Sequence, residues 1–227
     1  MAHVVDVEDR VRAPRSVPGE RMRRGYLPVA SSFTLWLASS EAGRIRFGPL
    51  TLLEFGEPEV EEHGVRWPIR GGLLAARAGG WLRIRWRDGE LSSRLHGYAP
   101  WLPRPIYWLT QLPVHHAVTR LTLLQLRGRD PLPGEPPGRR NLTLAAALDL
   151  ALCAALARAA PRRRGLALAG VYAGYHLAAW TLAGRTVGGA LFGWRLVSVD
   201  GSRVTAAQAL VRLLAGDQPA GTAPVRE

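Results

Sequence analysis

The sequence has 227 residues, with 30 basic and 18 acidic side chains, a net charge of +12 and one cysteine. This length allows one or two domains, and a single cysteine excludes a fold held together by intramolecular disulfides. Every basic residue is arginine. Arginine pairs well with phosphate groups, so an anionic lipid surface is a suitable partner. No zinc-finger spacing, basic heptad helix or RNP-like aromatic pattern is present, and we therefore expect no nucleic-acid partner.

The first segment, residues 1–24, mixes arginine, acidic residues and proline, and it predicts a disordered tail. It contains no apolar stretch of the kind found in secretory signals, so the N-terminal domain is expected in the cytoplasm. A short helix is predicted over Val29–Ser40, where apolar side chains cluster.

A β-meander is predicted to follow, because turn signals recur roughly every ten residues from Arg44 onwards. Its clearest hairpin consists of Trp81–Arg87, the turn Asp88-Gly89, and Glu90–Tyr98. Asp-Gly favours a type I′ turn because both central residues need positive φ. That turn places Arg87 opposite Glu90 and fixes the register of the whole hairpin.

The two faces of this hairpin differ in chemistry. One face is apolar and carries Leu82, Ile84, Trp86, Leu91 and Leu95. The other carries four arginines, Arg83, Arg85, Arg87 and Arg94. The register sets Arg83 opposite Arg94, and like charges directly opposed are unfavourable. This face therefore needs water, carboxylates or lipid phosphate, and it is either a solvated outer surface or an anionic-lipid patch.

A long helix is predicted from Arg104, with Pro105 tolerated in the first turn and an interruption at Pro113. Strands followed by one long helix resemble the helix-grip ligand-binding fold, by architecture alone. The predicted domain covers residues 25–127. A linker is predicted at residues 128–138, because this segment contains four prolines and three glycines.

Two apolar runs follow, Leu142–Ala160 and Leu166–Ala183, separated by the polar turn Pro161–Arg164. Each run approaches the ~20 residues that a helix needs to cross a bilayer. Their apolar residues occupy every helix face, unlike the single stripe of a surface helix. The runs predict a helical hairpin, either in a membrane or buried in a soluble bundle, with Asp149 inside the first run.

The residues after the second run carry a resemblance to a known family. Arg139-Arg140 precede the first run, Asp149 lies within it, and a glycine-rich segment with Thr186, Gly188, Gly193 and Arg195 follows the second. Asp200-Gly201 comes next, and the chain closes with Asp217-Gln218-Pro219-Ala220-Gly221-Thr222. This order resembles the RDD family of small bacterial membrane proteins over residues 139–227.

The resemblance implies a helical membrane domain whose signature residues are Arg140 (or Arg139), Asp149 and Asp217, with a suggested role in transport. Three departures stand out. The spacing from Arg140 to Asp149 is longer than is usual in the family. Gly189 occupies a position where the family usually has lysine. The third hydrophobic helix is reduced to Thr205–Ala215, which is too short to span a bilayer.

A carboxylate inside an apolar helix needs a partner. Arg140 lies roughly 13–14 Å from Asp149 along the helix axis, so the partner should come from another element. The candidates are cationic, namely Arg185, Arg195, Arg212 and His176. A small hairpin is also expected, with Arg195–Val199 pairing with Arg203–Val204 across the turn Asp200-Gly201.

The sequence thus predicts an α+β chain, with an antiparallel β-meander and a long helix followed by a small RDD-like helical membrane domain. The predicted location is the bacterial inner membrane, with membrane lipid and a homo- or hetero-oligomer as partners. No catalytic constellation, cofactor motif or metal-ligand spacing is evident, so we expect a non-enzymatic protein. It is either a membrane protein that binds a partner or lipid, a transporter component, or a soluble helix-grip-like module for a small ligand.

Overall fold

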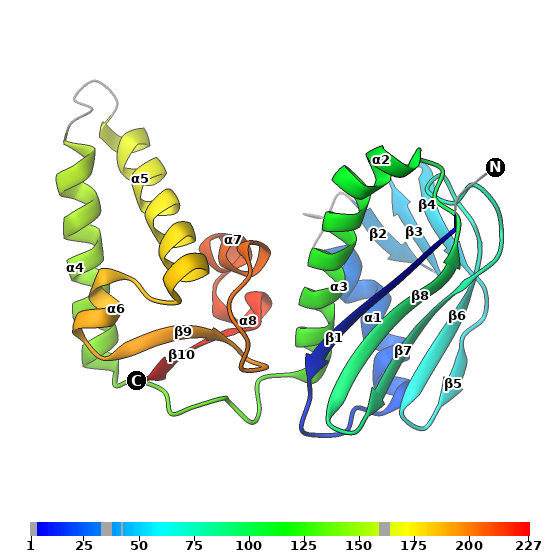
Figure 1. The fold of residues 1–227 in the computed structure, drawn as a ribbon, viewed down its shortest axis with the longest axis horizontal. Helices are drawn as coiled ribbons and strands as arrows, with labels where there is room; N and C mark the ends of the chain where they lie inside the picture. The colour runs from blue at the N-terminus through cyan, green and yellow to red at the C-terminus, as the bar shows by residue number, and fades with distance from the viewer. Residues whose placement is uncertain (1–3, 33–37, 42, 159–163) are drawn as a thin grey trace. The chain divides into compact units, whose positions relative to one another are not determined.

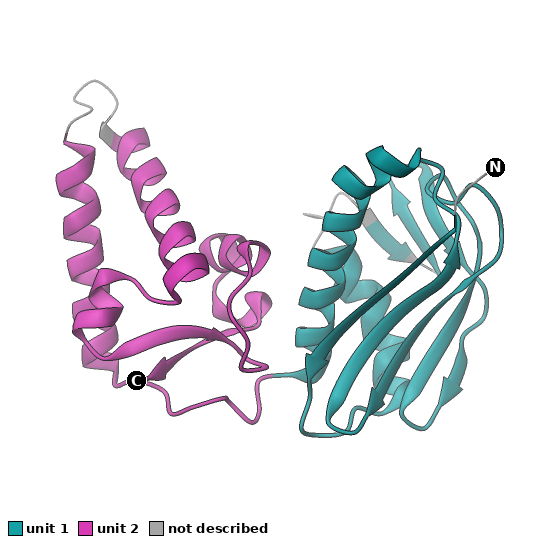
Figure 2. Ribbon diagram, in the orientation of Figure 1, with its two compact units in different colours: residues 1–128 teal, residues 129–227 magenta. Residues whose placement is uncertain are grey.

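The computed structural model describes residues 4–32, 38–41, 43–158 and 164–227. The chain divides into two compact units, Met1–Gly128 and Arg129–Glu227 (Figure 2). The division falls at the start of the predicted linker.

Unit 1 is an antiparallel sheet with helices on one face (Figure 1). Its elements are β1 (Val5–Arg12), α1 (Gly19–Ser32), β2 (Ala38–Glu41), β3 (Arg44–Phe47), β4 (Leu50–Phe55), β5 (Glu59–Glu61), β6 (Gly64–Gly71), β7 (Trp81–Arg87), β8 (Glu90–Tyr98), α2 (Arg104–Ile106), the π-helical turn η1 (Tyr107–Gln111) and α3 (Leu112–Arg127). The strands lie in the order β1-β8-β7-β6-β4-β3-β2, with β5 paired to β6. The sheet curls as a half-barrel around α3.

The predicted hairpin is confirmed in its register. Arg87 pairs with Glu90, Leu82 with Leu95 and Arg83 with Arg94. Asp88 has φ of +52° and Gly89 of +80°, the left-handed conformation that the turn requires. The predicted faces are also confirmed, since Leu82, Ile84, Leu91 and Leu95 are buried while Arg85, Arg87 and Arg94 are exposed.

The prediction of a disordered tail at residues 1–24 is wrong for its described part. Val5–Arg12 forms β1, the edge strand that pairs with β8, with Val7 and Val11 buried. The helix expected at Val29–Ser40 lies earlier, at Gly19–Ser32, and residues 33–37 lie outside the described part of the chain. Alternation of valine with charged residues produces a half-buried strand, whereas overall composition suggested a tail.

The long helix is continuous from α2 to α3 and accommodates Pro113 through η1. Proline has no N–H and clashes with the carbonyl four residues earlier. The wider π-helical turn at Tyr107–Gln111 ends one residue before the Leu112-Pro113 pair that opens α3, and it lets the helix continue where an interruption was expected.

Unit 2 begins with a helical hairpin. Its elements are α4 (Arg139–Ala157), α5 (Arg164–Ala178), the π turn η3 (Ala179–Ala183), α6 (Val187–Leu191), β9 (Trp194–Ser198), α7 (Ala206–Ala215), α8 (Asp217–Ala220) and β10 (Thr222–Arg226). A small core forms at the base of the hairpin, from Ala145, Trp180, Trp194, Leu196, Val204 and Ala209. The predicted turn at Pro161–Arg164 lies largely outside the described residues.

Two local expectations in unit 2 differ from the structure. β9 pairs with β10, with Val197 opposite Ala223, instead of with Arg203–Val204. Residues 199–202 form a turn and a bend, and the chain then runs without regular structure to Thr205, the N-cap of α7. The predicted linker is not a free spacer either. The Arg226 amide donates to the Glu135 carbonyl at 2.8 Å, and Pro137 is buried, so its second half packs on unit 2.

Candidate functional site

Asp149 lies in the middle of α4 with 2% of its surface exposed. Its Oδ1 accepts hydrogen bonds from the Tyr175 hydroxyl at 2.7 Å and from the Gly188 amide at 2.9 Å. The Tyr175 oxygen in turn accepts from the Val187 amide at 2.7 Å. The carboxylate thus joins α4, α5 and the start of α6.

These contacts correct the expectation of a cationic partner for Asp149. The four candidates make other contacts. Arg185 pairs with Glu227, Arg212 with Asp217, and the His176 Nδ1 donates to the Tyr172 carbonyl, while Arg195 is exposed on β9. A hydroxyl and a backbone amide satisfy the buried carboxylate instead, because α6 directs its unpaired N–H groups at it.

The glycine-rich segment is built around this contact. Thr186 caps α6, and its Oγ1 accepts from the Gly189 amide at 3.0 Å. A Cβ on Gly188 would lie 2.4 Å from the Ala145 carbonyl oxygen, so only glycine lets α6 pack on α4. Gly193 has φ of +68°, which turns the chain into β9.

The signature set Arg140, Asp149 and Asp217 does not form one cluster. Arg140 is exposed in the first turn of α4. Asp217 begins α8, where its Oδ1 pairs with Arg212 and accepts from the Thr222 hydroxyl at 2.9 Å. The Arg212 guanidinium also lies 4.9 Å from the Trp180 ring, a cation–π contact. Asp217 therefore holds α8 and the start of β10 against α7.

Asp217→Ala is expected to destabilise unit 2 by about 1–2 kcal/mol, because Arg212 would lose the carboxylate that neutralises it. The readout is the rate at which Cys153, the one cysteine of the chain, reacts with a maleimide in mild detergent, since this buried thiol becomes accessible only when α4 opens. Arg195→Ala, at an exposed residue, is the matched control. Equal labelling rates in the two variants would contradict this role.

Gln208 was missed by the sequence reasoning. It is fully buried, and its Nε2 donates to the Ser198 hydroxyl and to the Ala220 and Gly221 carbonyls at 3.1–3.3 Å. Its Oε1 accepts from the Thr205 amide at 3.2 Å, which completes a capping box. The Thr-x-x-Gln spacing before an apolar run was the available signal.

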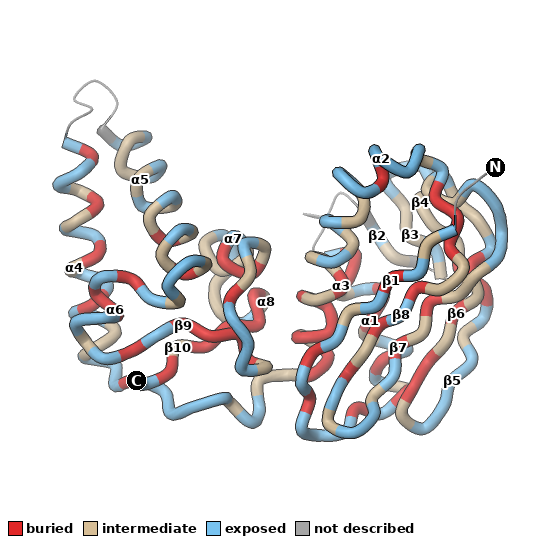
Figure 3. The backbone as a smooth tube through the Cα atoms, in the orientation of Figure 1, coloured by how far each residue is buried: buried red, intermediate tan, exposed pale blue. Residues whose placement is uncertain are grey.

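Most residues of the two hairpin helices are exposed or partly exposed (Figure 3). Arg139–Ala157 and Gly165–Ala183 are 19 residues each and are long and apolar enough to cross a membrane. Leu166 is 72% exposed and Leu182 is 81% exposed. Only 22% and 11% of the two apolar windows are buried, whereas the core helices of a soluble protein are mostly buried.

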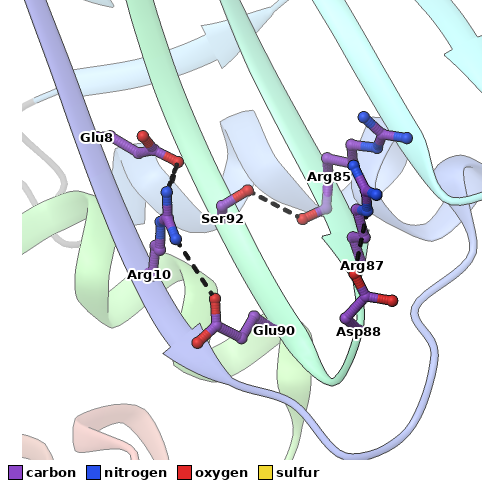
Figure 4. Close-up of polar contacts among 7 residues, drawn as sticks. All are labelled: Glu8, Arg10, Arg85, Arg87, Asp88, Glu90 and Ser92. Carbon is purple, nitrogen blue, oxygen red and sulfur yellow. Dashed lines mark hydrogen bonds and ion pairs between the residues drawn. The ribbon is translucent and has the colours of Figure 1, made fainter.

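Carboxylates pair with Arg83 and Arg87 on the arginine face of β7 and β8, and Figure 4 shows the contact of Arg87 with Asp88. Arg83 pairs with Glu61 at 2.7 Å, and Arg87 with Asp88 at 3.0 Å. Nearby, Arg10 bridges Glu8 and Glu90. Arg94 lies beside the Trp81 ring, and Arg85 is exposed. These pairs favour a solvated outer face over an anionic-lipid patch.

A cavity of about 250 Å³ lies between the concave face of the sheet and the helices of unit 1. Its lining is mainly apolar, from Tyr26, Leu27, Ala30, Ile45, Leu52, Leu53, Phe55, Ile69, Leu74, Leu82, Leu95, Tyr98, Tyr107, Val114 and Val118, with Gln111, His115 and Thr119 as polar members. Gln111 donates to the Tyr98 hydroxyl at 3.0 Å, and that hydroxyl donates to the Leu74 carbonyl.

Burial sets the charge of the cavity. It lowers the pKa of His115 to about 4 and raises the pKa of Tyr98 to about 12. Both side chains are therefore neutral near pH 7, and the cavity suits a neutral, largely apolar molecule.

Unit 1 is expected to lose stability as the pH falls from about 6.5 to about 4. In this window the unfolded chain protonates His115 while the folded chain does not, so protons favour unfolding. Across this pH window, His115→Gln should reduce the change in the free energy of unfolding by about 2 kcal/mol, a value that is discounted for the partial exposure of His115. Urea unfolding of both proteins across the window, followed by circular dichroism, measures it. Parallel curves would contradict the prediction.

Searches against models of known protein families, curated proteins and solved structures found no match to this chain.

Proposed function

We propose that this chain is a non-enzymatic bacterial inner-membrane protein, in which unit 2 is an RDD-like domain held in lipid and unit 1 is a cytoplasmic binding domain. The observation that carries the proposal is the α4–α5 hairpin, whose apolar side chains are exposed along helices of spanning length. Lipid is the environment in which such a surface is stable.

The contacts of the signature residues support the RDD-like assignment. Gly188 and Asp149 make the close contact between α6 and α4, and Asp217 holds the closing segment. Gly188, Asp149 and Asp217 thus each have a physical task in unit 2, whereas Arg140 and Arg195 are exposed.

Anchoring and binding fit this domain better than independent transport. The third helix, α7, has ten residues and a length of about 15 Å, half of the roughly 30 Å of a hydrocarbon core. Two membrane-spanning helices cannot enclose a route for a transported molecule. Transport by this chain would therefore require further copies of it or a partner protein.

Membrane fractionation tests the proposal. The chain should remain in the pellet after high-salt washing and enter the supernatant only with detergent. Leu150→Arg places a charge near the centre of α4, at a cost of about 2.5–3.5 kcal/mol for insertion, and should shift the chain out of the membrane. Leu214→Arg, at an exposed residue of α7, is the matched control. A monodisperse chain in plain buffer would overturn the proposal.

The cavity of unit 1 favours a second function, the binding of a small apolar ligand, which does not depend on the membrane. Its volume of about 250 Å³ exceeds that of the ~150 Å³ cavities that hold benzene. We expect the neutral fluorescent probe N-phenyl-1-naphthylamine to bind. Val118→Trp should fill the cavity and weaken binding at least tenfold, whereas Val60→Trp, at an exposed residue of β5, should not. Equal binding by both variants would contradict this function.

A further inference from the structure

The N-terminal end of the long helix exposes an unusual set of large apolar side chains. Trp101 is 69% exposed and Leu109 is 80% exposed, and Ile106, Trp108 and Val114 are also exposed. Tyr107 is the buried residue of α2 and η1, whereas the later turns of α3 are mostly buried (Figure 3). We call the segment from Trp101 to Val114 the apolar rim.

The chemistry of the apolar rim matches a lipid interface. Tryptophan concentrates at the headgroup level of bilayers, because its ring is apolar and its N–H remains polar. The Arg104 guanidinium lies 5.3 Å from the Trp108 ring, where it can reach lipid phosphate while its stem covers apolar surface. The sequence contains no acidic residue between Glu90 and Asp130, so nothing in the rim repels an anionic headgroup.

The rim also borders the cavity of unit 1. Val114 and Gln111, from the rim itself, line that cavity. Leu74 lines it as well, and its carbonyl accepts from the Trp101 amide at 3.0 Å. A surface that covers the rim would therefore lie against the cavity lining.

We propose that the apolar rim, from Trp101 to Val114, docks unit 1 onto the surface of an anionic lipid bilayer. Docking on the rim brings the cavity next to the membrane, so its ligand would be drawn from molecules dissolved in lipid. The inference concerns unit 1 and holds whether or not α4 and α5 cross the bilayer. It also assigns membrane contact to a different surface from the arginine face of β7 and β8.

A site-specific fluorophore on the full chain tests the inference. Leu109→Cys in a Cys153→Ala background carries a nitrobenzoxadiazole label, and the matched control carries the label at Val60→Cys on β5. The chain is mixed with vesicles of phosphatidylglycerol and phosphatidylcholine whose acyl chains are brominated. We expect a blue shift and strong quenching by bromine at position 109, and neither at position 60. The signal should weaken in vesicles of phosphatidylcholine alone.

A double variant separates docking from simple misfolding. Trp101→Gln with Trp108→Gln should abolish the quenching at position 109, while N-phenyl-1-naphthylamine still binds to the cavity. A label at 109 that stays exposed to aqueous iodide with vesicles present overturns the inference. A label shielded from iodide but not quenched by bromine also overturns it, and would indicate that a protein surface covers the rim. Fractionation reports on α4 and α5 separately, so either proposal can fail alone.

Discussion

Gly188→Val is expected to destabilise unit 2 by about 3 kcal/mol, which corresponds to more than a hundredfold increase in its open population. A Cβ at position 188 would lie 2.4 Å from the Ala145 carbonyl oxygen and 2.9 Å from the Ala145 Cα. These are backbone atoms of α4, which cannot rotate away as a flexible side chain would. Valine therefore pushes α6 off α4 and breaks the amide contact to Asp149. Maleimide labelling of the buried Cys153 in mild detergent measures the change.

Gly170→Ala is the matched control for this substitution. A Cβ at position 170 meets nothing within 4 Å, and the residue is helical within α5. Alanine is a better helix former than glycine by roughly 1 kcal/mol, so the control should be neutral or stabilising. Similar labelling rates for the two variants would contradict a requirement for glycine at position 188.

The sequence predicted local structure well where one residue pair determines the geometry. Asp88-Gly89 adopts positive φ at both positions, and this alone fixes which of Trp81–Arg87 faces which of Glu90–Tyr98. The period-two alternation of the strands then assigns the buried and exposed faces. The arrangement followed from local rules and needed no knowledge of the rest of the chain.

Local sequence patterns could not predict the pairing of strands that lie far apart in the chain. Val5–Arg12 pairs with β8, from Val5 opposite Tyr98 to Arg12 opposite Glu90, so the partners lie far apart in the chain. Most of its charged residues face outwards, whereas Asp9 lies on the inner face and pairs with His116 of α3. Its composition therefore resembles that of a tail. β10 similarly pairs with β9 across α7 and α8, where the sequence offered a nearer turn at Asp200-Gly201. In each case a distant segment supplied the strand's hydrogen bonds.

The candidate site was predicted in its residues and not in its contacts. Asp149 accepts from the Gly188 amide at the start of α6, which Thr186 caps, and the sequence had marked all three residues. The partner of Asp149 was expected to be a charged side chain, because such residues are visible in a sequence. Every residue except proline has a backbone N–H group, so no sequence pattern marks the amide that donates to a buried carboxylate.

Asp149→Ala is expected to destabilise unit 2 by about 4 kcal/mol. Alanine leaves the buried Gly188 amide and the Tyr175 hydroxyl without their acceptor, and each unsatisfied group costs about 1–3 kcal/mol. Asp149→Asn keeps a carbonyl oxygen at the same position and should cost about 1 kcal/mol. The two variants therefore separate the need for an acceptor from the need for a charge. Cys153 labelling in mild detergent again provides the readout.

A double-mutant cycle with Tyr175→Phe isolates the hydroxyl contact. Phenylalanine removes the bond to Asp149 and also the acceptor for the Val187 amide. Because the two side chains share one network, the losses from Asp149→Ala and Tyr175→Phe should not add, with a coupling of about 1 kcal/mol or more. Additive losses would mean that the two residues act separately. If Asp149→Asn were as unstable as Asp149→Ala, the charge of the carboxylate would hold α6 in place, as the sequence alone suggested. An uncharged hydrogen-bond acceptor at this position would then not be sufficient.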